Sequence, residues 1–224
     1  MTIKKDSLIK RIVYMAIMYF IGPLPLSFVL IMSYKKNIVT LIALTVAWVL
    51  ANAAVIYIAY RLVCRYTQKP ILQKANLSDL LYVFGGYATI LISNGILTFL
   101  NHAIYNRVQS PNNLAIEKSL LNHHQLMVAV LIINLIVVTP IVEELIYRGM
   151  AFNLFFNSNQ VWLKILLSAV LFSSAHQSNT IFSFLTYAFI GIILGFVYWK
   201  SGKLQNSMAL HALTNLVAVL AILL

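Results

Sequence analysis

Seven apolar stretches occupy most of this 224-residue chain, and they constrain its fold more than any other feature. A helix needs about 20 residues to cross the ~30 Å hydrocarbon core of a lipid bilayer. The stretches lie near residues 12–33, 38–60, 80–102, 126–154, 160–178, 180–199 and 204–223. The sequence therefore predicts an all-α fold, a polytopic membrane helix bundle with about seven transmembrane helices.

The composition supports this class of protein. Hydrophobic residues make up 61% of the chain and charged residues 9%, whereas about a quarter of a soluble domain is charged. We therefore expect a multi-pass protein of a cell membrane, in contact with the lipid bilayer, and favour a bacterial plasma membrane. The net charge of +11 comes mainly from basic residues that flank the apolar stretches, so we expect no nucleic-acid partner.

The distribution of basic residues predicts the orientation, since cytoplasmic loops are enriched in Lys and Arg. With the N-terminus inside, the cytoplasmic side receives twelve of them: Lys4, Lys5, Lys10, Arg11, Arg61, Arg65, Lys69, Lys74, Arg148, Lys164, Lys200 and Lys203. The external side receives four: Lys35, Lys36, Arg107 and Lys118. We therefore predict a cytoplasmic N-terminus and an external C-terminus.

The sequence "TPIVEELIYRGM", residues 139–150, places two adjacent carboxylates at the end of an apolar run. An ionisable side chain at the centre of a membrane helix costs about 2.5–3.5 kcal/mol on insertion scales, so such residues usually have a function or a partner. Glu144 and Arg148 are four residues apart and can pair on one helix face. Glu143 is rotated by about 100° from Glu144, has no evident partner and is therefore a candidate functional residue.

Two later stretches carry further polar residues. His176 lies in the fifth stretch, and His211 and Asn215 share one face of the seventh. Taken singly, such residues are more often interhelical hydrogen-bond partners than catalytic groups. However, an antiparallel hairpin turning at residues 157–159 places Glu143 and His176 at a similar depth. We therefore expect the four side chains to meet at one buried site.

These side chains favour hydrolysis of an amide. A carboxylate and an imidazole can hold a water molecule and remove its proton, while a second imidazole and a carboxamide can stabilise an oxyanion. Two His and one or two Glu also suit zinc, although the HExxH motif is absent. Two non-enzymatic alternatives are a proton-coupled transporter, which would also keep ionisable groups in its core, and an immunity protein that blocks a bacteriocin's receptor or pore.

Three short motifs follow one another on these stretches. "EELIYR" matches EExxxR, "FSSAH" matches FxxxH through Phe172 and His176, and "HALTN" matches HxxxN. In this order they resemble the CPBP family, the CAAX proteases and the Abi-like bacteriocin-processing enzymes. The resemblance covers roughly residues 125–221. It divides a single membrane unit into N-terminal transmembrane helices with a connecting loop, 1–124, and a catalytic core, 125–221.

The resemblance implies an intramembrane endopeptidase acting on a membrane-embedded peptide or protein substrate, prenylated or bacteriocin-like, in bacteriocin self-immunity or processing. It implies that Glu143 and His176 activate water, that His211 and Asn215 bind the oxyanion, and that Glu144 and Arg148 complete the motif. The family has been described both as metalloproteases and as metal-independent glutamate proteases. The resemblance therefore implies zinc as a cofactor under the first description and no metal under the second. Only residues 216–224 follow Asn215 where relatives usually carry another helix, which favours a small bacterial member.

Overall fold

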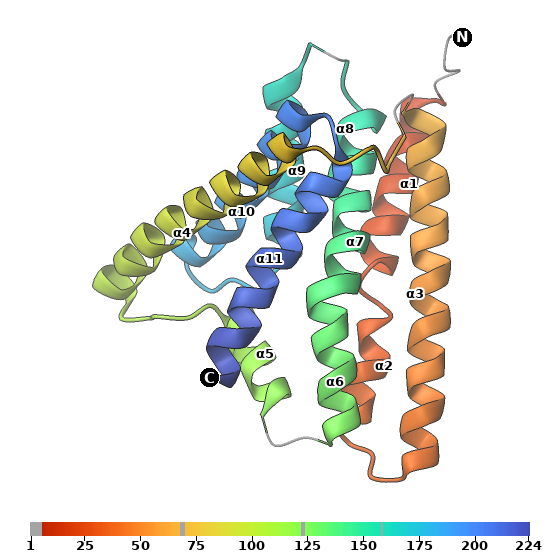
Figure 1. Cartoon of the computed structure of the whole chain (residues 1–224), viewed down its shortest axis with the longest axis vertical. Coiled ribbons are helices and arrows are strands. Elements are labelled where there is room, and N and C mark those ends of the chain that lie inside the picture. The colour runs from red at the N-terminus through yellow and green to blue at the C-terminus, as the bar shows by residue number, and fades with distance from the viewer. Residues whose placement is uncertain (1–5, 68–69, 122–123, 158) are drawn as a thin grey trace.

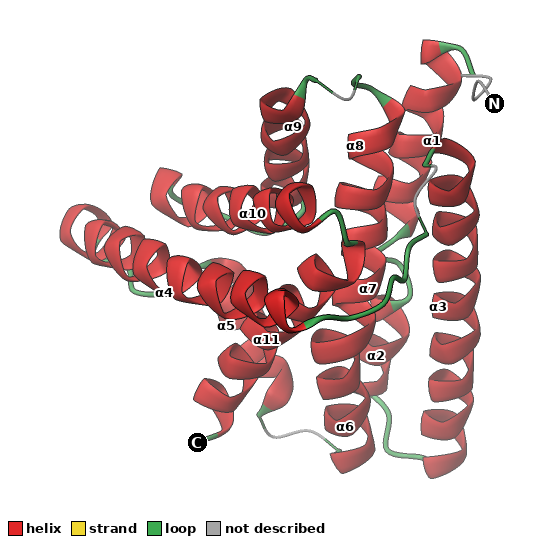
Figure 2. Cartoon of the chain, turned by 45° about the horizontal axis from the view of Figure 1, so that its top comes forward, coloured by secondary structure: helices red, strands yellow, loops and turns green. Residues whose placement is uncertain are grey.

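The computed structural model describes residues 6–67, 70–121, 124–157 and 159–224, and these residues form helices and loops without a strand (Figures 1 and 2). Within them, six helical stretches are long and apolar enough to cross a membrane: Leu8–Met32, Ile38–Tyr66, Leu77–Tyr105, Gln125–Leu154, Ile181–Ser201 and Leu204–Leu223. The stretch predicted at 160–178 forms a shorter helix, Val161–Ser174. At 1.5 Å per residue its 14 residues extend about 21 Å, less than the ~30 Å core. The predicted all-α membrane bundle is confirmed, with six spans and one short helix in place of about seven spans.

The first span is broken in its middle. Helix α1 (Leu8–Ile21) is followed by the Gly22-Pro23-Leu24-Pro25 turn and then by α2 (Leu26–Met32). The two prolines lack an N–H to donate and their rings obstruct the preceding turn, so a regular helix cannot continue through them. The break brings Gly22 and Pro23 to the wall of the central cavity described below.

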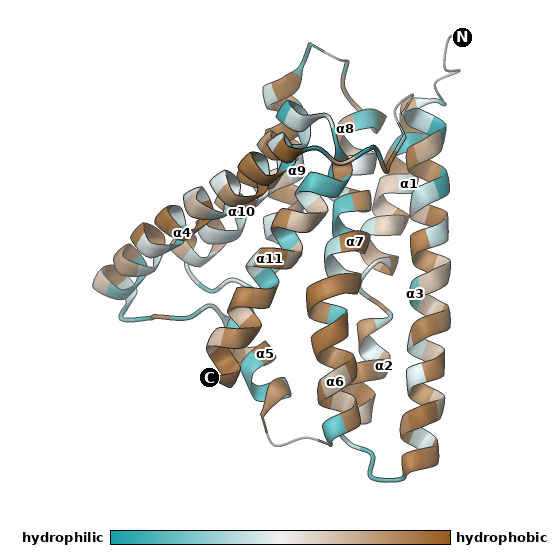
Figure 3. Ribbon diagram, viewed as in Figure 1, coloured by the Kyte–Doolittle hydropathy of each residue, from teal (hydrophilic) through white to brown (hydrophobic). Residues whose placement is uncertain are grey.

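The second and third spans are single long helices with well-formed N-termini. Helix α3 (Ile38–Tyr66) is capped by Asn37, whose side chain accepts from two backbone N–H groups. Helix α4 (Leu77–Tyr105) starts with a capping box between Asn76 and Asp79. Both helices expose many apolar side chains along their outer faces, which is the surface expected of helices that contact lipid (Figure 3).

The long connection after α4 contains a short helix, α5 (Pro111–Leu120), whose first turn is capped by Ser110 and begins with a proline. Helix α5 lies at the end of the molecule opposite the N-terminus, near the C-terminus and the start of α6 (Figure 1). It lines the central cavity through residues that include Ile116 and Glu117.

The fourth span alternates α-helical and π-helical turns, which the sequence did not indicate. It consists of α6 (Gln125–Ile133), η1 (Asn134–Val138), α7 (Thr139–Glu144), η2 (Leu145–Met150) and α8 (Ala151–Leu154). The first π-helical turn precedes Pro140, which cannot donate a backbone hydrogen bond. The N–H of Thr139 instead bonds five residues back to the carbonyl of Asn134. The α7 segment carrying Glu143 and Glu144 thus lies between two π-helical turns, a feature frequent at functional sites.

The last three helices are α9 (Val161–Ser174), α10 (Ile181–Ser201) and α11 (Leu204–Leu223). Gly202 turns the chain between α10 and α11 with φ of 67°, in the left-handed region that favours glycine. Helix α10 packs closely on α9 at Gly191. A Cβ atom added to this glycine would lie only 2.8 Å from the Cα of Ala169. Small residues allow membrane helices to approach in this way.

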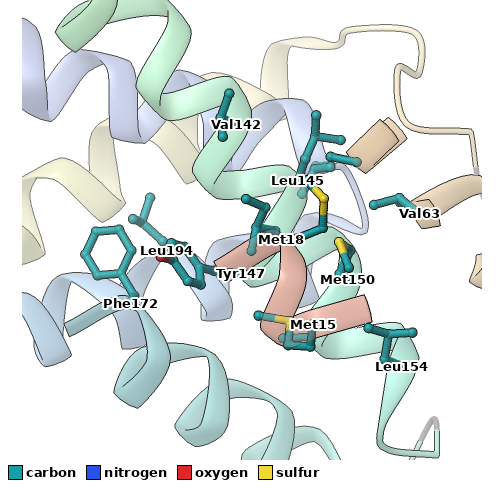
Figure 4. Close-up of a cluster of buried hydrophobic side chains, with 14 of the residues drawn as sticks. Met15, Met18, Val63, Val142, Leu145, Tyr147, Met150, Leu154, Phe172 and Leu194 are labelled. Carbon is teal, nitrogen blue, oxygen red and sulfur yellow. The ribbon is translucent and has the colours of Figure 1, made fainter. Parts of the chain in front are cut away.

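The main apolar core fills the space between α1, α3, the fourth span, α9, α10 and α11. Tyr147, Met150 and Phe172 lie in this cluster with Met15 and Met18 of α1 (Figure 4). The fully buried ring of Phe172 also faces the candidate site. The N-terminal half of the chain therefore packs directly on the segment that carries the three motifs.

Several segments whose basic residues were assigned to the cytoplasmic side lie at one end of the molecule, whereas Arg148, also assigned to that side, is fully buried within the fourth span. The start of α1, the end of α3, the start of α4 and the turn between α10 and α11 lie at the same end (Figure 1). Two ion pairs tie this end together, Arg65 with Asp6 at 2.9 Å and Lys203 with Asp79 at 2.8 Å. The hydrogen bond from Tyr66 and the charge of Arg65 hold the pKa of Asp6 below its usual value. Lys4, Lys5 and Lys69 lie outside the described residues, and the cytoplasmic assignment of this end stays a prediction.

Candidate active site

A cavity of about 470 Å³ lies between the fourth span and α11, with further walls from α2, α5 and the loop after α9. Four of the six residues singled out from the sequence line it: Glu143, His176, His211 and Asn215. The other two, Glu144 and Arg148, are fully buried. The structure thus brings all six predicted residues to one region, in two groups: a cavity-lining set and a buried pair.

The Glu144 carboxylate accepts three hydrogen bonds in the interior. Its Oε1 atom lies 2.7 Å from Nη1 of Arg148 and 3.0 Å from Nδ1 of His211. Its Oε2 atom accepts from the hydroxyl of Ser207 at 2.5 Å. A buried charge is stable only when it is paired and hydrogen-bonded in this way. Both oxygens of Glu144 are therefore hydrogen-bonded, and Glu144 is not among the residues that line the cavity.

The predicted pair between Glu144 and Arg148 forms, and Arg148 makes further contacts. Its Nη2 donates to the backbone carbonyl of Gly191 on α10 at 3.1 Å. Its guanidinium carbon lies 4.7 Å from the ring centroid of Phe172, a favourable cation–π arrangement. Arg148 therefore links the fourth span to both α9 and α10.

The Glu144 carboxylate sets the tautomer of His211. An ionised carboxylate can only accept, so Nδ1 of His211 carries a hydrogen, and in the neutral ring Nε2 is an acceptor. This Nε2 atom lies 3.9 Å from Oε2 of Glu143, too far for a hydrogen bond. The two groups can therefore contact a common small molecule without bonding to each other.

His176 is held by its own helix end and by two aromatic rings. Its Nδ1 lies 2.7 Å from the carbonyl of Phe172, which can only accept, so Nδ1 carries the hydrogen and Nε2 keeps a lone pair. The Tyr187 ring stacks on the imidazole with centroids 4.3 Å apart and planes inclined by 18°. The ring of Phe172 lies 4.5 Å from His176 and 5.5 Å from His211, so it separates and positions both imidazoles.

Glu143 differs from the other buried acids. Its side chain is 20% exposed, and its Oε2 atom is buried with no hydrogen-bond partner in the part of the chain that the structure describes. A buried carboxylate oxygen without a partner costs free energy, unless a water or a substrate group supplies the missing bond. Glu143 is therefore the acid of the EExxxR motif whose buried oxygen lacks a hydrogen-bond donor among the described residues.

Asn215 is positioned by the irregular backbone of the fourth span. Its Nδ2 donates to the carbonyl of Leu135 at 2.8 Å. In a π-helical turn this carbonyl would accept from the residue five positions on, which is Pro140 and has no N–H. One N–H of the Asn215 carboxamide therefore donates the hydrogen bond that the Leu135 carbonyl would otherwise lack. The second N–H of the carboxamide can donate to a ligand in the cavity.

Two residues that contact this site, Ser207 and Tyr187, were not predicted from the sequence. Ser207 precedes His211 by four residues on α11, so their shared helix face was a signal that could have revealed it. Tyr187 had no such signal, because its partners are distant in the chain. Its hydroxyl bonds to Ser110 at 2.8 Å and to Asn113 at 3.0 Å, joining α10 to the first turn of α5.

Residues 125–217 match the model of the family described as type II CAAX prenyl endopeptidase Rce1-like. This segment is similar to that family. The match confirms the resemblance drawn from the three motifs and contains all six site residues. It covers less than half of the chain, and the helices α1 to α5 lie outside it.

Two curated relatives share part of the sequence, both from Lactococcus lactis subsp. lactis strain IL1403. The UPF0177 protein YvdC is 34% identical over 74 residues, which are 33% of this chain and 28% of that protein. The UPF0177 protein YbdJ is 33% identical over 85 residues, which are 38% of this chain and 36% of that protein. The similarity therefore spans only about a third of the length of each relative. No solved structure gives a significant match.

Two His and one or two Glu in this segment are residue types that could supply ligands to zinc. Among the described residues, no group of three or more His, Cys, Asp or Glu side chains is arranged to hold a metal ion. Glu144 already accepts three hydrogen bonds, whereas the Nδ1 contacts of the two histidines leave each Nε2 with a lone pair. As arranged in the structure, the described groups do not form the three-ligand site of a catalytic zinc, and the water activation proposed below uses no metal.

Proposed function

We propose that this multi-pass membrane protein is an intramembrane endopeptidase in which Glu143 and His176 activate a water molecule. The observation that carries the proposal is the unpartnered carboxylate oxygen of Glu143 in a cavity shared with two imidazoles and a carboxamide. The Rce1-like match over the same segment supports it. Intramembrane ionisable residues without structural partners are typical of functional sites.

In the proposed reaction, the Glu143 carboxylate takes one proton from a water molecule whose other hydrogen is held by Nε2 of His176. The water oxygen attacks the carbonyl carbon of a peptide bond and forms the new C–O bond. The resulting tetrahedral oxyanion collapses, the C–N bond breaks, and the protonated Glu143 returns its proton to the leaving amine. General acid–base assistance of this kind contributes about 10²–10⁴ to the rate.

Asn215 and His211 are proposed to stabilise the oxyanion. The second N–H of the Asn215 carboxamide can donate into the cavity, since the first is held by Leu135. In its doubly protonated form His211 donates from Nε2, and the Glu144 carboxylate on Nδ1 stabilises the charge of that imidazolium. Donors already held in place stabilise developing charge without a cost of reorganisation.

For the substrate, we propose a membrane-associated peptide, because the cavity lies between helices that span the bilayer. We further propose a setting in a bacterial plasma membrane and a role in bacteriocin processing or self-immunity. The curated relatives from Lactococcus lactis support the bacterial setting.

The proposal is tested by comparing membrane proteomes of cells expressing the wild-type protein or Glu143→Gln. Expression of the wild type should produce new peptide termini from membrane-associated proteins, and equal amounts of the variant should not. Identical sets of termini in both strains would contradict the proposed protease activity.

A chelator should leave the wild-type activity unchanged. The proposed residues activate water without an ion, and the geometry of the described residues does not fit a three-ligand zinc site. Purified protein in liposomes is incubated with EDTA, assayed on a cleaved peptide and analysed for bound metal. Stoichiometric zinc whose removal abolishes cleavage, and whose return restores it, would assign the water activation to a metal.

A further inference from the structure

One carboxylate of the cavity has no place in the proposed mechanism. The chain has five acidic residues, and three of them form ion pairs: Asp6 with Arg65, Asp79 with Lys203 and Glu144 with Arg148. Glu143 belongs to the site. The fifth, Glu117, lies half-buried on α5 and lines the same cavity, and its side chain forms no ion pair with the basic residues of the described ranges.

The charge of the cavity is opposite to that of the whole chain. The protein carries 16 basic and 5 acidic residues, yet the cavity lining described here contains Glu117 and Glu143 and no Lys or Arg. Glu143 has His211 beside it, whereas Glu117 forms no ion pair with the described basic residues, and a carboxylate among apolar walls attracts ligands of the opposite charge. The cavity therefore favours a cationic group.

Uncharged polar side chains surround Glu117 and suit a peptide backbone. Gln109, Asn112 and Asn113 precede it on the same wall, and Asn52 and Asn134 belong to the helices that line the rest of the cavity. Carboxamides both donate and accept hydrogen bonds, as a peptide group does. A few polar groups among apolar walls are what fixes the orientation of a ligand in a cavity.

Helix α5 is connected to the catalytic histidine, so Glu117 has a defined position relative to it. The Tyr187 hydroxyl bonds to Ser110 and Asn113 at the start of α5, while its ring stacks on His176. Glu117 follows Ser110 by seven residues, about 10 Å along the helix. A substrate group bound at Glu117 would thus lie at a fixed offset from the bond being cleaved.

The position of α5 also gives the direction of entry. Helix α5 lies at the end of the molecule opposite the N-terminus (Figure 1). The Lys and Arg distribution predicts that the N-terminal end is cytoplasmic, so α5 and this part of the cavity face the exterior.

We infer that Glu117 forms a subsite for a Lys or Arg side chain of a peptide substrate that enters the cavity from the external face of the membrane. This inference rests on the proposed endopeptidase function. It specifies the substrate class as a basic peptide segment that is exported or exposed outside the cell.

The test uses the purified full-length protein in liposomes, a mixed library of synthetic peptides and mass spectrometry of the cleavage products. The wild type should cleave with Lys or Arg enriched at one fixed position relative to the cleaved bond. Glu117→Gln should lose the enrichment, and kcat/KM for the preferred peptide should fall about tenfold, mainly through KM. Glu117→Lys should favour Asp or Glu at that position. Lys118→Gln, which changes the adjacent exposed residue of α5 outside the cavity lining, should keep the wild-type preference.

The outcomes distinguish a failure of the endopeptidase function from a failure of the Glu117 subsite. Wild-type products no different from those of Glu143→Gln would overturn the endopeptidase function and this inference together. Products without a basic preference, or a preference that survives in Glu117→Gln, would overturn the Glu117 subsite alone. Each variant is checked by its melting temperature, so that loss of folding is not scored as loss of preference.

The direction of entry is tested on a Cys64→Ala, Glu117→Cys double variant, since Cys64 is the single and exposed cysteine. A membrane-impermeant maleimide should label it in intact cells. Labelling confined to inside-out vesicles would overturn entry from the external face.

Discussion

Glu143→Gln should lower kcat by about 10²–10⁴ or more, with little change in KM or folding. The carboxamide keeps the shape and volume of the side chain but cannot accept a proton from water. Glu143 is 20% exposed and makes no hydrogen bond through its buried Oε2 to any of the described residues, so its replacement removes little structural stabilisation. Cleavage of a peptide substrate by purified protein in liposomes, at saturating and limiting concentrations, measures the effect.

The melting temperature of Glu143→Gln, recorded in the same lipids, serves as the control for folding and should stay within a few degrees of the wild-type value. His176→Ala should show the same pattern of a large loss in kcat with an intact fold. Full activity in Glu143→Gln would remove the general base from the mechanism and with it the proposed water activation.

Arg148→Ala should destabilise the protein strongly, by about 3–5 kcal/mol, and reduce the amount of folded protein in the membrane. The substitution leaves the buried Glu144 charge with Ser207 and His211 as its remaining partners. It also removes the hydrogen bond to the carbonyl of Gly191 and the contact with the Phe172 ring. Thermal unfolding of the purified protein and the yield from equal membrane samples measure the loss.

Arg65→Ala is the matched control, because it breaks an ion pair whose arginine side chain is 54% exposed. Solvent screens such a pair, so this variant should melt close to the wild type. An Arg148→Ala protein that melts like the wild type but is inactive would show that Arg148 acts in catalysis instead of holding the fourth span in place.

The membrane fold could be predicted from the sequence for local reasons, and so could the set of polar residues that lie together at the candidate site. Apolar runs of about 20 residues are visible without any tertiary contact. Glu144 and Arg148 are one helical turn apart, so their pairing follows from helix geometry alone. The three motifs each lie within a single helical stretch or at its end, and their order indicated one shared site.

The boundaries were less accurate where backbone geometry departs from a regular helix. The stretch near 160–178 ends as a helix at Ser174, and the fourth span contains two π-helical turns. Hydropathy does not distinguish α-helical from π-helical turns, because the two differ in which carbonyl each N–H bonds and not in how apolar their residues are. Only the three-dimensional backbone shows that Pro140 leaves the Leu135 carbonyl for Asn215 to satisfy.

By itself, the sequence determined that this protein is a helical membrane bundle with a small set of polar residues inside it. Only the tertiary structure decided which of these residues are free to react. Glu143 and Glu144 are neighbours in the sequence and chemically identical. Contacts from α11, more than 60 positions away, occupy the Glu144 carboxylate, while the buried oxygen of Glu143 has no hydrogen-bond partner within the described ranges. Such contacts depend on how separate helices pack against each other, and this packing cannot be deduced from the spacing of residues within one helix.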